Sequence, residues 1–313
     1  MGMMRERLEK FLFPARSTTW IALLRLGLGL QVIVYAVSLW NDWTYLLAAH
    51  SDSLISRDLS EEILSLDSSF IPRLGWLVTV GGQLGLSEQV TLKLAWACLF
   101  CSGVCLLIGF LSRPAAIAAW LLHLAARSSG GLTAYGVDNF MTIGLFYLML
   151  CPLPDRYSLD SRLWKGRAPD PQRVGFHQRV FQLHLCLIYF FGGLAKALGA
   201  GWWNGNSIWR ALTRSPFNII PPDFLLQWSV LLPALGIFIC LVEIGYSIFI
   251  WPKKTRNIWL ACVLAMHAGI AAAMGLHLFA LIMIVLNLAA FGPDLIPFSF
   301  SKPKLLPTRL PQS

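Results

Sequence analysis

The chain has 313 residues, of which 56% are hydrophobic and only 13% are charged. Soluble globular proteins have about 45–50% apolar and about 25% charged residues, so a soluble fold of this length could not bury its apolar surface. The composition also excludes an intrinsically disordered chain, a collagen and a nucleic-acid-binding arm. The formal net charge of +9 is then expected in loops that anchor a membrane protein, not in a nucleic-acid interface. The sequence predicts an all-α polytopic membrane protein.

The chain begins with a basic segment, residues 1–17, in which residues 3–14 predict a short amphipathic helix on the inner membrane surface. A transmembrane domain is expected over residues 18–295, and a cytoplasmic tail over 296–313. Eight apolar stretches in that domain are candidate transmembrane helices: 18–40, 89–110, 114–128, 136–152, 180–198, 225–251, 257–275 and 277–292. The third, fourth and eighth stretches are short for a span of about 20 residues, so their ends are the least certain.

The basic residues predict the orientation. With eight spans and a cytoplasmic N-terminus, 17 of the 25 Lys and Arg residues fall on the cytoplasmic side and the C-terminus joins them there. The opposite side receives the acidic loop between the first two spans. The basic residues on the cytoplasmic side are Arg5, Arg7, Lys10, Arg16, Arg113, Arg156, Arg162, Lys165, Arg167, Arg173, Arg179, Lys253, Lys254, Arg256, Lys302, Lys304 and Arg309.

Ionisable side chains within the spans are the candidate functional residues, since each is costly in lipid. This topology places Arg25, Glu243 and His184 in the inner half of the membrane. Opposite charges at similar depth predict a structural ion pair between Arg25 and Glu243.

A second cluster is expected in the outer half and contains Lys196, Asp138, His123, Arg127 and His277, with His267 below it. Lys196 follows Gly192 and Gly193, whose missing side chains permit close helix approach. A buried neutral amine at this position would act as a general base. The alternative is a lysine whose side chain extends to the outer headgroups, and for His267 a plain interhelical hydrogen bond.

Other chemistry has weaker signals. Trp202 and Trp203 follow the fifth span as expected interface anchors, with Trp202 also placed at the wall of the outer pocket. The seven cysteines lie in or beside apolar segments and predict helix-packing thiols. No recognised metal-ligand motif is present, so no metal is predicted.

Several segments resemble the membrane domain of vitamin K-dependent gamma-carboxylases and the wider HTTM group (horizontally transferred transmembrane domain). The most specific is YFFGGLAKALGAGWWNG (189–205), with a Tyr-Phe-rich helix, paired glycines, a lysine and then tryptophans. RYSLDSRL (156–163) and MHAGIAAAMGLHLF (266–279) resemble further family segments, and Glu243 falls where the family has a membrane acid.

The resemblance implies a quinone-dependent carboxylase-like enzyme of the bacterial inner membrane, with a reduced, vitamin K-like quinone as cofactor and a peptide or protein as substrate. Lys196 aligns with the lysine that deprotonates the quinol, and Asp138 and His267 join it as candidate catalytic residues. Asp138 stands where the carboxylases place a histidine, so a Lys196–Asp138 pair is also expected; it would hold the amine charged.

The resemblance also leaves a second function open. The carboxylases carry a large extramembrane domain, whereas this chain ends shortly after the last expected span. Some proteins of the group resemble a membrane subunit for the maturation, export or immunity of a small peptide, which works with a separately encoded soluble partner. A transporter is the third possibility, but no internal repeat is seen.

Overall fold

The fold is a bundle of helices in a computed structural model that describes residues 2–49, 55–164 and 168–294. All regular secondary structure in these ranges is helical. The long helices are α2 (Thr19–Ser38), α6 (Glu88–Ile108), α7 (Ser112–Ser129), α8 (Gly136–Leu150), α10 (Pro171–Ala197), α14 (Leu231–Phe249), α15 (Lys253–Met274) and α16 (His277–Phe291). The short ones are α1 (Gly2–Leu12), α3 (Trp43–Leu46), α4 (Arg57–Asp67), α5 (Leu74–Gln83), α9 (Leu159–Leu163), α11 (Ala200–Trp203), α12 (Asn206–Thr213) and α13 (Pro222–Gln227), with 3-10 turns at Gly131–Thr133 and Gly292–Asp294.

Each of the eight predicted spans coincides with one long helix. Five of these helices, namely α2, α6, α10, α14 and α15, are long and apolar enough to cross a membrane. Helices α8 and α16 are apolar but have only 15 residues each. The chain is therefore a multi-pass membrane protein, and the number of eight crossings stays a prediction.

One predicted span was too long at its N-terminal end. The stretch 225–251 is divided into α13 and α14, with a break after Gln227 and a new start at Leu231. Pro233 explains the start, because proline has no backbone N–H and is tolerated only in the first turn of a helix. Helix α10 is longer than predicted because Asp170 caps it by accepting the N–H of Gln172, and Pro171 occupies its first position.

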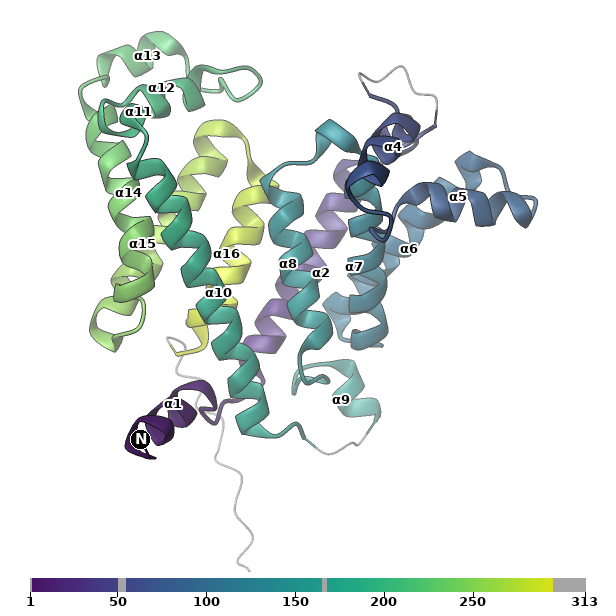
Figure 1. Cartoon of the computed structure of the whole chain (residues 1–313), viewed down its shortest axis with the longest axis horizontal. Helices are drawn as coiled ribbons and strands as arrows, with labels where there is room; N and C mark the ends of the chain where they lie inside the picture. Colours follow the sequence, from purple (N-terminus) through teal and green to yellow (C-terminus); the bar gives the residue numbers. More distant parts are fainter. Residues whose placement is uncertain (1, 50–54, 165–167, 295–313) are drawn as a thin grey trace, which may run out of the picture.

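Helix α2 is the centre of the bundle and packs against α6, α8 and α16. Figure 1 shows α10, α14, α15 and α16 on one side of it and α6 and α7 on the other, while α8 overlaps it in this view. Gly29 lies so close to α6 that an added Cβ would be 2.6 Å from the backbone nitrogen of Leu107. Small residues let membrane helices approach closely. This close packing stabilises helix association in lipid, where the hydrophobic effect does not drive helices together.

The bundle has two ends of different character (Figure 1): α1 and α9 lie at one end, and α4, α11, α12 and α13 lie at the other. At the α1 end, the Arg179 guanidinium donates to the backbone oxygen of Phe11 (2.9 Å) and stacks 4.9 Å from the Trp251 ring. This contact joins α1, α10 and the turn after α14. Arg179, one of the basic residues predicted on the cytoplasmic side, therefore lies at the end of the bundle that carries α1. The predicted tail 296–313 lies outside the described residues, and the orientation stays a prediction.

The predicted ion pair between Arg25 and Glu243 is wrong. Arg25 is 1% exposed and its Nε lies 2.6 Å from Oδ2 of Asp155, which is fully buried. The same guanidinium donates to the backbone oxygens of Leu106 and Leu107. Asp155 lies in the loop after α8, and no local pattern predicts that this loop is buried in the bundle, so its role as counter-ion was not predicted.

Ser158 and Asp160, which follow Asp155 in the segment 156–163, stabilise the ends of two helices. Asp160 accepts the backbone N–H groups of Leu111 and Ser112 at 2.7 Å each, at the start of α7. Ser158 caps α9 by accepting the N–H of Ser161. An acidic side chain at a helix N-terminus satisfies donors that the helix cannot. The loop after α8 is thereby fixed under the turn between α6 and α7.

We expect Arg25→Met to lower the free energy of unfolding by about 3–5 kcal/mol, because the Asp155 carboxylate would be left buried without its counter-ion. Thermal unfolding of the purified protein in detergent measures the effect. Adding Asp155→Asn to Arg25→Met should recover part of the loss. The exposed Arg162 provides the control, and Arg162→Met should change the unfolding midpoint little. Equal losses for both methionine variants would contradict the assignment.

Candidate functional site

The candidate site is an ion pair between two helices. The Nζ of Lys196, at the end of α10, lies 2.6 Å from Oε2 of Glu243 in α14. The Glu243 side chain is 10% exposed and that of Lys196 is 29% exposed, so the pair has one open side. Lys196 therefore meets a carboxylate, as the sequence suggested, but from Glu243 and not from Asp138.

Gly193 allows α10 to approach α14 at this point, and the neighbouring Gly192 does not take part in the close contact. A Cβ on Gly193 would lie 2.8 Å from both the Glu243 Cβ and the Ile244 backbone nitrogen, whereas one on Gly192 would meet its nearest atom, Glu243 Oε2, at 3.6 Å. The short helix α11 then follows α10, and Lys196 Nζ lies 5.6 Å from the centre of the Trp202 ring. Trp202 thus covers the ion pair and does not merely anchor the chain at the interface.

A chain of buried polar side chains lies on the same seam. The hydroxyl of Tyr189 is 2.8 Å from Nε2 of His267 and accepts a hydrogen bond from the Asn287 amide at 2.7 Å. The Asn287 oxygen accepts in turn from the Tyr246 hydroxyl at 2.8 Å. The Nδ1 atom of His267 is buried without a hydrogen-bond partner. Helices α10, α14, α15 and α16 are thereby connected through polar groups in the interior of the bundle.

Helix periodicity connects this polar chain to the ion pair. Tyr189 precedes Lys196 by seven residues on α10, and Tyr246 follows Glu243 by three on α14, so each couple shares one helix face. The rings of Tyr189 and Tyr246 meet with their centres 4.2 Å apart. Sequence reasoning missed Tyr189, Tyr246 and Asn287, although the seven-residue spacing from Lys196 was a signal for the first of them.

The predicted outer cluster is divided between two places. Asp138 lies in α8 and accepts from the Tyr35 hydroxyl at 3.2 Å and from the Tyr135 backbone N–H at 2.9 Å. The expected Lys196–Asp138 pair is therefore wrong. His123 accompanies Asp138, with its Nε2 atom 3.2 Å from the Asp138 backbone oxygen. Asp138 meets α2 through Tyr35, whereas Lys196 meets α14 through Glu243. Depth alone could not separate the two groups, because it does not say which helices are neighbours.

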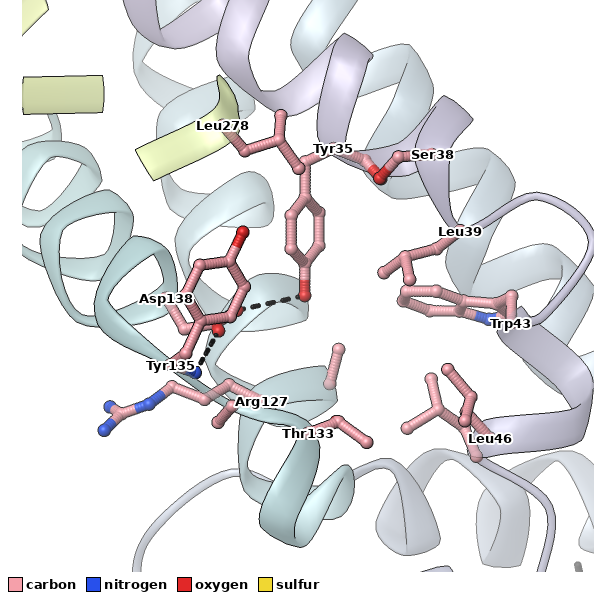
Figure 2. A pocket seen from close by; sticks show the side chains of 13 residues that line it. Tyr35, Ser38, Leu39, Trp43, Leu46, Arg127, Thr133, Tyr135, Asp138 and Leu278 are labelled. Carbon is pink, nitrogen blue, oxygen red and sulfur yellow. Dashed lines mark hydrogen bonds between the residues drawn. The ribbon is translucent and has the colours of Figure 1, made fainter. Parts of the chain in front are cut away.

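Asp138 borders a cavity of about 220 Å³ at the end of α2 and α8, which Figure 2 shows in detail. Arg127 also lines it, but its guanidinium group points away from the space (Figure 2).

Two further histidines lie elsewhere. His277 is exposed at the first residue of α16. His184 lies 2.9 Å from the Tyr147 hydroxyl, through its Nδ1 atom, and so contacts α8 and neither Arg25 nor Glu243. Within the described ranges no three His, Cys, Asp or Glu side chains gather closely enough to bind a metal.

Comparison with known proteins adds no family: no protein-family model, curated protein or solved structure gives a significant match to the chain.

The two glycines provide a test of the seam. Gly193→Ala should destabilise the protein by about 1–3 kcal/mol, because the new methyl group would force α14 away from α10. Gly192→Ala should be tolerated, since its methyl group would make only ordinary contacts and alanine favours the helix. Thermal unfolding in detergent compares the two variants. The close approach would be disproved by a Gly193→Ala variant as stable as Gly192→Ala.

Proposed function

We propose that the chain is a multi-pass membrane enzyme with quinone-dependent, carboxylase-like activity, in which Lys196 and Glu243 form the acid–base pair. The 2.6 Å contact between Lys196 Nζ and Glu243 Oε2 supports this proposal most directly. Charged groups are costly in a membrane and mark functional sites by default. This pair is also partly open, unlike the fully enclosed pair of Arg25 and Asp155.

The pair can exchange a proton without help from water. A hydrogen-bonded ammonium and carboxylate become a neutral amine and a neutral acid when one proton moves from Lys196 to Glu243. The neutral amine of Lys196 can then accept a proton from an acidic hydroxyl group brought to it, and Glu243 holds the proton that the amine gave up.

The side chains present fit a reduced quinone. Lys196 supplies a polar nitrogen for a ring oxygen, and Trp202 supplies an aromatic face beside it. The 29% exposure of Lys196 leaves one direction of approach. A bound quinol would supply the redox chemistry with oxygen that the resemblance to carboxylases implies. The buried polar chain from Tyr189 to His267 would keep the helices around the site in fixed positions.

The membrane topology forms part of the proposal. We place both termini in the cytoplasm of a bacterium, with eight crossings of the inner membrane. The ion pair then faces the non-cytoplasmic half, where a peptide or protein substrate would be exported. The short helices α11, α12 and α13 cover this end of α10 and α14 (Figure 1).

The test uses the purified protein in lipid nanodiscs with reduced menaquinone or vitamin K, oxygen, labelled bicarbonate and a glutamate-containing peptide. We expect quinol consumption with the wild type. Lys196→Ala and Glu243→Gln should each lower the rate by about 10²–10⁴-fold, the usual contribution of general acid–base catalysis.

Lys93→Ala is the matched control, because Lys93 is an exposed lysine on α6, away from the pair. It should keep the wild-type rate. Quinol consumption that is equally fast in Lys196→Ala and in wild type would refute the role of the pair, and absence of quinol binding to the wild type would refute the function.

The second candidate is a non-enzymatic membrane subunit for maturation, export or immunity of a small peptide. Exposed apolar side chains around α13, such as Phe224, Trp228 and Val230, favour contact with lipid or with a protein partner at this end. Here Lys196→Ala should leave the biological phenotype unchanged, and the chain should co-purify with a separately encoded partner.

A further inference from the structure

The cavity beside Asp138 is separate from the Lys196 site and has its own chemistry. Its volume of about 220 Å³ exceeds the share of one water molecule, about 30 Å³ in the liquid, several times. It lies where α2, α7 and α8 meet, at the end of the bundle that carries α4. Its walls include Leu39, Leu46, Leu47 and Leu278, so the greater part of the space is suited to an apolar body.

Asp138 gives this apolar space an uncompensated negative charge. Its side chain is only 4% exposed. The two donors that reach its carboxylate from the described residues, the Tyr35 hydroxyl and the Tyr135 backbone N–H, are neutral. In the described part of the chain, no Lys or Arg nitrogen lies within 4.0 Å of it, and His123 Nε2 stands at 4.0 Å. A buried carboxylate without a cation is costly, so a cationic group in the cavity would be favoured.

Aromatic rings border the same space. Figure 2 shows the rings of Tyr35 and Trp43 on opposite sides of the opening, with the Tyr35 hydroxyl directed at Asp138. The Trp43 indole is held in place by its hydrogen bond to the backbone oxygen of Leu92, 2.9 Å away. Aromatic faces attract ammonium groups through the charge distribution of the ring. Arg127 does not oppose this, because its guanidinium group is directed outwards (Figure 2).

We propose that this cavity binds a small organic ammonium, with the cationic nitrogen at the Asp138 carboxylate and its apolar body among the leucines and the rings of Tyr35 and Trp43. From the residues that the structure describes, each Asp138 oxygen accepts one hydrogen bond, and it can accept another from an N–H of the ligand. The proposal concerns binding alone and does not depend on the activity proposed for Lys196.

The test compares two probes of nearly the same shape, 2-phenylethylamine, which is protonated at pH 7, and the neutral 2-phenylethanol. Isothermal titration calorimetry of the protein in detergent, with a micelle blank, measures both. We expect saturable binding of the amine that is at least tenfold tighter than that of the alcohol. Asp138→Asn should lose at least tenfold in amine affinity and leave the alcohol unaffected, because the amide keeps the acceptor oxygen and removes the charge.

Asp223→Asn is the matched control, since Asp223 is an exposed acid in the first turn of α13, outside the cavity. It should bind the amine as the wild type does, and so should Lys196→Ala. Equal affinity for amine and alcohol in the wild type would overturn the proposal, even if Asp138→Asn failed to fold. Unchanged amine affinity in a folded Asp138→Asn variant, or no saturable amine binding to the wild type, would also overturn it.

Discussion

The structure depends on one constraint: a polar side chain inside a membrane bundle has to find its partner within the protein, because lipid offers none. Arg25 shows what this requires. Its guanidinium reaches the carboxylate of Asp155 and two backbone oxygens at the end of α6, so one side chain joins α2, α6 and the loop after α8. The loop is held inside the bundle end by that charge, and its next acid, Asp160, can then cap α7.

The same constraint applies along the contact between α10 and α14, where the polar side chains pair with one another and not with a loop. Lys196 and Glu243 satisfy each other, and deeper along the seam Tyr189, Tyr246 and Asn287 form a chain of hydrogen bonds with His267. A network that spans four helices is stiff, because each member loses several partners if one helix moves. The open side of the ion pair is therefore set in a rigid frame, which suits the proposed proton transfer from a bound molecule to Lys196.

The sites at Lys196 and at Asp138 differ in the charges that they contain. At Lys196 a positive and a negative charge are present and nearly in contact, so the pair can move a proton between its own members. At Asp138 a single negative charge faces a cavity with aromatic walls and neutral donors. We propose chemistry for the first arrangement and capture of a cation for the second, and the two carboxylates belong to different helices, α14 and α8. One outer cluster, as the sequence suggested, would have combined these properties at a single place.

The sequence by itself determined the class of protein and the approximate place of the eight long helices, because apolar runs act locally along the chain. It missed the start of α10 and the break between α13 and α14. It identified Lys196, Glu243, Asp138 and His267 as ionisable residues that a membrane makes costly. Only the tertiary structure decided their partners. Depth along a helix follows from residue number, but the direction in which a side chain points around the bundle follows from which helices are neighbours, and non-local packing alone fixes that.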